Sequence, residues 1–218
     1  MAAAVVERDY GSVEYWERRY HVEPAPVDFY LGYGELIPYL EPVLSGDAKD
    51  VLVSGCGASE LGAELSDRHA HKVTCVDACH ALIKHMQTRY SAKDRLEYRE
   101  MDCRDMRNFN NETFDCVLDK ALFDVVLCGN QNLSSIALMT TEAFRVLKPG
   151  GAYVVVTHGA PQTRLGYLER PALNWRVTVL PVQKPKISKA PHRADDVYYA
   201  YICRKANREP SSSEASLY

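Results

Sequence analysis

The chain has 218 residues, 46% of them hydrophobic, and a formal net charge of -3. That length and apolar content predict one domain with a full hydrophobic core. Because the net charge is small and negative, the overall charge of the chain does not favour binding to nucleic acid. A local basic patch is still compatible with it.

The start of the chain and the cysteines bear on its compartment. The first residues, MAAAVVERDYG, contain neither a basic segment nor a long apolar one, and no run of about 18 apolar residues follows. The cysteines form no CxxC pair, and His69 and His71 lack partners at zinc-site spacing. We therefore expect reduced thiols, no metal site, no membrane partner and a cytoplasmic location.

An aromatic cluster near the start is the first feature in chain order. Tyr15, Trp16, Arg19 and Tyr20 fall at helical spacing. This spacing by itself predicts a helix packed against the core.

A glycine-rich turn follows the first strand-like run. The run VLVSGCGAS at Val51 to Ser59 carries apolar, β-prone residues directly into Gly55-Cys56-Gly57, which predicts a buried strand ending in a turn. A second short strand, Lys72 to Val76, ends at Asp77. Glycines that admit a ligand and an acid that accepts from ribose hydroxyls predict a βαβ unit that binds an adenosine compound.

Two motifs that this sequence lacks narrow the choice of adenosine compound. A dinucleotide fingerprint needs a third glycine three residues after the second, and this chain has Glu60 there. A carboxylate would repel a pyrophosphate, so NAD and FAD are disfavoured. The GxxxxGK[ST] pattern of a P-loop is absent as well.

Strand and helix patterns continue to alternate along the rest of the chain. Further helices are predicted at Glu60 to Asp67, Ala78 to Tyr90 and Ser134 to Val146. Further strands are predicted at Leu96 to Glu100, Phe114 to Leu118, 152–157, Trp175 to Leu180 and Val197 to Ile202. The helix at Ser134 stops at KPGG, and the last two strands form an antiparallel pair around a Pro/Lys-rich loop. The expected fold is α/β, a Rossmann-like doubly wound sheet that is mostly parallel with an antiparallel C-terminal strand.

Several motifs together resemble one enzyme family. The loop LVSGCGAS, the run FDCVLDKALFD and RVLKPGG before the fifth strand resemble class I methyltransferases that use S-adenosylmethionine (SAM). With EYWERRY, DFYLGYG and MDCRDM, the chain is similar to a eukaryotic group of protein lysine methyltransferases that act on elongation factor 1-alpha and citrate synthase. It departs from that group at Ser54, Ala58 and Ala121.

The resemblance implies a cofactor site and a lid. SAM is the implied cofactor and S-adenosylhomocysteine its product. Residues 1–45 are implied to form an N-terminal lid or helical segment whose aromatic faces contact the sulfonium side. The implied cofactor-binding residues are Tyr15, Trp16, Arg19, Tyr20, Phe29, Gly55, Cys56, Gly57, Asp77, Ala78, Asp102, Cys103, Asp119 and Lys120. Asp77 and Asp102 also suit plain capping or turn roles.

The implied acceptor is a lysine side chain on a protein. A lysine with a free pKa of about 10.4 must arrive neutral, and burial beside a sulfonium favours that form. Asp119, Lys120 and Asp124 are the candidate catalytic residues, with the two acids orienting the incoming ammonium. Tyr33 and His158 are further candidates.

Alternatives from other classes stay open. A small-molecule methyltransferase shares the glycine turn and the KPGG turn. A SAM-binding interaction module without catalysis would fit the altered Ser54, Ala58 and Ala121. A nucleic-acid methylase is disfavoured, because LDKA stands where [DNS]PP[YF] or a Pro-Cys nucleophile is expected.

We expect one methyltransferase domain over residues 1–207 and a disordered tail over 208–218. The acceptor's identity, the number of methyl groups transferred and the oligomeric state do not follow from the sequence.

Overall fold

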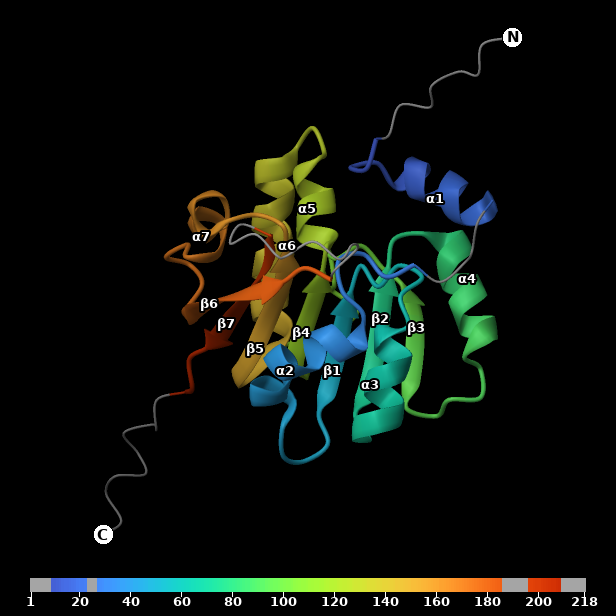
Figure 1. Cartoon of the computed structure of the whole chain (residues 1–218), viewed down its shortest axis with the longest axis horizontal. Helices are drawn as coiled ribbons and strands as arrows, with labels where there is room; N and C mark the ends of the chain where they lie inside the picture. The colour runs from blue at the N-terminus through green and yellow to red at the C-terminus, as the bar shows by residue number, and fades with distance from the viewer. Residues whose placement is uncertain (1–8, 23–26, 186–195, 209–218) are drawn as a thin grey trace.

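The computed structural model describes residues 9–22, 27–185 and 196–208. Within them, a sheet lies between two layers of helices (Figure 1). The strands are β1 Asp50–Ser54, β2 Lys72–Asp77, β3 Leu96–Glu100, β4 Phe114–Lys120, β5 Leu147–Thr157, β6 Trp175–Gln183 and β7 Val197–Lys205. The helices are α1 Val13–Val22, α2 Tyr33–Leu44, α3 Leu61–His69, α4 His80–Arg89, α5 Leu122–Leu127, α6 Asn132–Val146 and α7 Pro161–Leu168.

The strand order across the sheet is β3-β2-β1-β4-β5-β7-β6. Strands β1 to β5 pair in parallel, whereas β7 runs antiparallel to both of its neighbours, β5 and β6. The predicted α/β sheet with an antiparallel C-terminal strand is confirmed. The order reverses beside β1, which is where open parallel sheets bind ligands, beyond the carboxyl ends of their strands.

Two apolar cores hold the layers together. One packs α2, α3 and α4 on one face of the sheet through residues such as Leu40, Leu65 and Leu82. The other packs α5, α6 and α7 on the opposite face, around Phe123 and Ile136. Near-continuous burial along β1, β2, β4 and β5 is what a parallel sheet covered on both faces requires.

The structure contains two helices that were not predicted, and one strand begins earlier than predicted. Helices α5 and α7 were not predicted, because six to eight residues are too few for a clear helical period. The KPGG turn was expected to precede the fifth strand, but it lies inside β5. Leu147 already pairs with Phe114, and an irregularity follows before Ala152 pairs with Cys116.

Helix α2 contains two prolines, Pro38 and Pro42, which remove two backbone donors from it. It persists because Leu36, Leu40 and Leu44 are buried against the sheet. Within residues 1–45, α2 is therefore part of the core, whereas α1 lies above α4 and adds Tyr20 to that core (Figure 1).

The expected tail, apart from Arg208, and most of the Pro/Lys loop lie outside the described residues, as do residues 1–8. In the part of the chain that is described, no helix has the length and apolar character needed to cross a membrane.

Candidate functional site

Strand register brings the predicted site residues to one edge of the sheet. Ser54 at the end of β1 pairs with Val76 of β2 and Asp119 of β4. Asp77 of β2 pairs with Glu100 at the end of β3. The segments that follow β1, β2, β3 and β4 therefore start side by side, although they are far apart in the sequence.

The glycine turn after β1 has the conformation that only glycine adopts freely. Gly55 and Gly57 have φ values of +59° and +53°, both in the left-handed region. A Cβ on Gly55 would lie 2.6 Å from Leu122 Cδ1, and one on Gly57 would lie 3.0 Å from the Tyr20 hydroxyl. The turn is thus closely packed by the chain itself, with Leu122 on one side and Tyr20 on the other.

Asp77 connects the glycine turn to α4. Its Oδ2 accepts from the Gly57 amide at 3.0 Å, and its Oδ1 accepts from the Cys79 amide at 3.0 Å. Burial raises the pKa of this carboxyl above its ordinary value, and the amide hydrogen bonds oppose that rise. Asp77 therefore has the capping role noted from the sequence and also borders the cavity described next.

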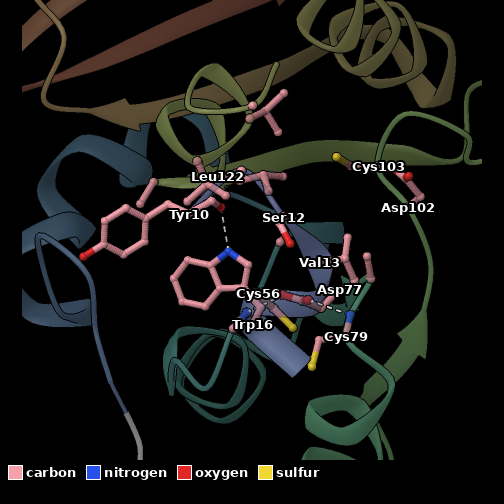
Figure 2. A pocket seen from close by; sticks show the side chains of 18 of the residues that line it. Tyr10, Ser12, Val13, Trp16, Cys56, Asp77, Cys79, Asp102, Cys103 and Leu122 are labelled. Carbon is pink, nitrogen blue, oxygen red and sulfur yellow. Dashed lines mark hydrogen bonds between the residues drawn. The ribbon is translucent and has the colours of Figure 1, made fainter. Parts of the chain in front are cut away.

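A cavity of about 380 Å³ opens at this edge. Its size is in the range of small-molecule sites, roughly 300–1,000 Å³. Figure 2 shows Trp16, Asp77 and Asp102 around it. The predicted cofactor residues that line it are Trp16, Tyr20, Phe29, Gly55, Cys56, Gly57, Asp77, Ala78, Asp102, Cys103 and Lys120. Tyr15, Arg19, Asp119 and Asp124 are not among the lining residues.

Helix α1 and the residues before it cover the cavity. The Trp16 indole donates to the Tyr10 carbonyl at 2.8 Å and stacks on Tyr20 with ring centroids 5.8 Å apart. A Cβ on Gly11 would lie 2.5 Å from the Gly129 Cα, so the N-terminal segment touches the segment between α5 and α6. The lid thus reaches from α4 to the far wall of the cavity.

Tyr15 and Arg19 support this lid from behind. Tyr15 is buried and makes edge contacts with the rings of Tyr10 and Trp16, at 5.3 Å and 5.2 Å. Arg19 donates to the Tyr15 hydroxyl at 3.3 Å, and its guanidinium lies 5.7 Å from the centroid of the Trp16 ring. Both residues hold the cavity-lining indole in place.

Asp102 follows β3 and is paired with Arg104. The Arg104 guanidinium donates to both carboxylate oxygens, at distances of 2.6 Å to 3.0 Å. Burial pulls the pKa of Asp102 upward, but the hydrogen bonds from Arg104 outweigh burial and the pKa lies below its ordinary value. The site thus presents an ionised carboxylate beside the buried thiol of Cys103.

Lys120, at the end of β4, bonds to two residues that lie between α1 and α2 in the sequence. Its ammonium donates to Asp28 Oδ1 at 2.8 Å and to the Phe29 carbonyl at 3.0 Å. Ser59, after the glycine turn, bonds to the same Asp28. Burial lowers the pKa of Lys120, and the hydrogen bond from its ammonium to the Asp28 carboxylate opposes that shift. Lys120 therefore positions Phe29 at the cavity wall.

Ala121 occupies a strained conformation at the cavity wall. Its φ is +74°, a value that favours glycine, and the methyltransferase group it resembles has glycine at this position. The departure noted from the sequence thus falls on a residue whose left-handed backbone conformation costs about 1 kcal/mol or more when a side chain is present.

Asp119 and Asp124 lie in the core behind the cavity. Asp119 accepts from the Phe123 amide at 3.0 Å and from the Tyr153 hydroxyl at 2.9 Å. Burial raises its pKa to about 7. Asp124 is also buried. Its Oδ1 accepts from Thr157 and Arg164 at 2.6 Å each, and its Oδ2 accepts from the Tyr30 hydroxyl at 2.8 Å. Neither carboxylate has a free face toward the cavity.

Sequence reasoning missed the walls contributed by the segment before α1 and by α5. Tyr10, Ser12, Leu122, Val125 and Gln131 line the cavity, together with Cys79 at the start of α4. Gly11 and Gly129 were the available signals, since each is a glycine at a close backbone approach. Tyr33, a further candidate from the sequence, instead bonds to His69 away from this cavity.

Comparisons with known proteins agree with this geometry. A family model described as a methyltransferase domain matches residues 52–155. The chain is 31% identical to EEF1A lysine methyltransferase 4 of Mus musculus over 176 residues, which is 76% of this chain and 68% of the relative. It is 28% identical to the eEF1A lysine and N-terminal methyltransferase of Mus musculus over 213 residues, 94% of this chain but only 30% of that longer protein.

A solved structure shares the fold. It is the 1,6-didemethyltoxoflavin-N1-methyltransferase of Burkholderia thailandensis, crystallised with its substrate and S-adenosylhomocysteine. The TM-score is 0.64 at 16% identity, and the match covers 95% of this chain and 93% of that one.

Proposed function

The chain belongs to the class I methyltransferases that use SAM, and from that premise we propose that it methylates a lysine side chain of a protein. The observation that carries the lysine assignment is the 31% identity to the mouse EEF1A lysine methyltransferase 4 over 176 residues. Elongation factor 1-alpha is accordingly the first candidate acceptor, and the cytoplasm the compartment of the reaction.

The cavity residues fit the cofactor. The glycine turn lines the cavity without bulky side chains at Gly55 and Gly57, and carboxylates at the ends of β2 and β3 suit hydroxyl and amino groups. We propose that Asp77 holds the ribose, Asp102 and Cys103 the adenine, and Trp16, Tyr20 and Phe29 the side that carries the charged sulfur. When bound, SAM supplies a reactive methyl group on a positively charged sulfonium.

The protein's own contribution is alignment and the exclusion of water. Trp16 and Phe29 are in edge contact at 5.9 Å, and both line the cavity. Lys120 fixes the Phe29 main chain through its ammonium. With the acceptor amine aligned behind the methyl group, transfer needs no covalent enzyme intermediate.

We further propose that residues 1–207 act as one methyltransferase domain in which α1 is the lid. In support, α1 contributes Trp16 and Tyr20 to the cavity, and the strands that build the site all lie after residue 49.

The test uses tritiated SAM and a cell lysate. The purified chain is incubated with intact lysate and with lysate digested beforehand by a protease. The proposal predicts label in the protein fraction, including elongation factor 1-alpha, and loss of that label after digestion. Label that stays in the small-molecule or RNA fraction, and that survives digestion, would reject the lysine assignment. The Asp77→Ala variant is the control for cofactor-dependent labelling.

A further inference from the structure

A second cluster of polar side chains lies next to the cofactor cavity but is not used in the account above. It consists of Tyr30 from the segment before α2, Asp124 of α5 and His158 after β5. The Tyr30 hydroxyl donates to Asp124 Oδ2 at 2.8 Å and lies 2.9 Å from His158 Nδ1. His158 Nδ1 is also 3.0 Å from Asp124 Oδ2.

The cluster borders the cavity through chain neighbours. Ala121, which lines the cavity, donates its amide to the Val156 carbonyl at 3.0 Å, two residues before His158. Phe29 lines the cavity, and the next residue, Tyr30, is the one bonded to His158. The ends of β4 and β5 thus place the cluster next to the cavity wall formed by Phe29 and Ala121.

The hydrogen bonds assign the tautomer of His158. Asp124 is ionised: burial alone would raise its pKa, but bonds from Thr157, Arg164 and Tyr30 hold the pKa below its ordinary value. The single proton of the Tyr30 hydroxyl goes to Asp124 Oδ2, so in its 2.9 Å contact with His158 Nδ1 the hydroxyl oxygen accepts and the nitrogen carries the proton. His158 Nδ1 therefore donates, and Nε2 is left as an unprotonated acceptor.

His158 and Asp124 differ strongly in solvent exposure. The His158 side chain is 59% exposed, whereas that of Asp124 is 7% exposed. Asp124 has no free oxygen for an incoming ammonium, because Thr157, Arg164 and Tyr30 occupy both oxygens. The group that a substrate can reach is the imidazole.

Tyr30 is held in a costly conformation in order to reach this cluster. Its φ is +68°, which is unfavourable for a bulky side chain. Its ring packs on Tyr198 of β7 with centroids 4.6 Å apart. Such local strain persists where the surrounding contacts fix the residue, and it is common at functional sites.

We propose that His158 accepts the proton of the acceptor lysine, with Asp124 and Tyr30 positioning its ring. The step rests on the proposed function. The ammonium N–H bond breaks, its proton passes to His158 Nε2, and the electron pair stays on the lysine nitrogen for attack on the methyl group. The resulting imidazolium is stabilised by Asp124 and returns the proton to bulk water through its exposed edge.

Tyr30 and Asp124 are titratable groups that contact His158 directly. Beyond them, Arg164 of α7 bonds to Asp124, Tyr198 of β7 packs on Tyr30, and Lys184 lies 5.2 Å from the Tyr198 ring centroid. Of these, Asp124 is the nearest charge to the imidazole, and Arg164 already neutralises its other oxygen.

The test compares wild type with His158→Gln and Tyr30→Phe, using His85→Gln on α4 as the matched control. Single-turnover methylation of the labelled protein substrate is followed from about pH 5 to about pH 9, and SAM affinity is measured in parallel. The wild-type rate should fall on the acidic side with the titration of one group. His158→Gln should lower the rate about a hundredfold near neutral pH and leave SAM affinity unchanged. It should also abolish the acidic limb, which is the fall of the rate toward low pH.

Tyr30→Phe should shift the acidic limb without abolishing it, and His85→Gln should match wild type. The ring nitrogens of His158 in the protein without cofactor provide a second readout by NMR: the Nδ1–H tautomer is expected. An Nε2–H tautomer, or a His158→Gln variant with the wild-type pH profile, would overturn the proposal. If the wild-type protein labels no protein at any pH, the proposed function fails and this inference fails with it.

Discussion

The carboxylate of Glu17 on α1 accepts the backbone amide of His80, the first residue of α4, at 2.5 Å. Its second oxygen accepts from the Ala81 amide at 3.3 Å. Burial pulls the pKa of Glu17 upward, but these amide bonds outweigh it and the pKa lies below its ordinary value. The lid is therefore anchored at the helix start that Asp77 also caps through Cys79.

Loss of this anchor should weaken cofactor binding. We expect Glu17→Ala to lower SAM affinity about 2-fold to 30-fold, because removing a helix-capping side chain costs about 0.5–2 kcal/mol. Arg18→Ala, at an exposed position on the same helix, should bind like wild type. Calorimetric titration measures both variants. Equal affinities for the two would show that α1 covers the cavity without help from Glu17.

Asp77 should matter for binding more than for folding. Asp77→Ala leaves the Gly57 and Cys79 amides without their acceptor and removes the proposed ribose ligand, so SAM affinity should fall by about 1–3 kcal/mol. The exposed Asp47→Ala is the matched control. Titration with SAM, S-adenosylhomocysteine and NAD checks the result. We expect no NAD binding, because Glu60 stands at the third glycine position and pairs with Arg89 at 2.6 Å.

The glycine turn should tolerate no side chain even in the protein without cofactor. Gly55→Ala combines an unfavourable φ of +59° with a clash against Leu122, so it should lower the free energy of unfolding by about 2–4 kcal/mol. Adding Leu122→Ala should recover the part due to the clash. Gly34→Ala on α2 has open space at its Cβ and should be neutral or stabilising. Chemical denaturation measures all three, and a wild-type stability for Gly55→Ala would contradict the packing argument.

Asp119 should make the stability pH-dependent. The folded protein keeps this proton up to about pH 7, whereas the unfolded chain loses it near the ordinary value of 3.8. The folded state therefore binds more protons between these values, so stability falls as pH rises through that window and levels off above it.

Asn at this position can still accept from the Phe123 amide and donate to Tyr153. Relative to wild type, Asp119→Asn should gain about 1–3 kcal/mol of stability at pH 8 compared with pH 4. Denaturation curves at the two pH values provide the measurement. A difference from wild type that does not change with pH would mean that Asp119 is ionised in the folded protein.

Much of the fold was predictable because its signals are local. Val51 to Val53 are buried apolar residues that lead directly into a glycine turn, and the acid after β2 marks the next strand end. These short-range patterns place Gly55, Gly57, Asp77 and Asp102 correctly at one edge. The order of strands then follows from parallel pairing and crossover rules.

The orientation of side chains was less predictable, because it depends on contacts between distant segments. Asp119 lies near the end of β4 and Asp124 lies four residues after that strand, yet Tyr153 and Arg164 bond to their carboxylates in the core. The cavity walls formed by Tyr10 and Val125 were not predictable, because these residues are more than a hundred positions apart in the sequence and line the same cavity only in the folded chain. The roles of the individual site residues remain proposals, which the variants above test.

The most direct measurement of the central claim identifies the methylated amino acid itself. Protein labelled by the chain with tritiated SAM in a lysate is hydrolysed completely, and the radioactive amino acids are separated against methylated standards. Our account predicts tritium in mono-, di- or trimethyllysine, and less of it with the Asp77→Ala variant at the same limiting SAM concentration. Tritium in methylarginine or methylhistidine, or no label in protein at all while small molecules are methylated, would contradict it.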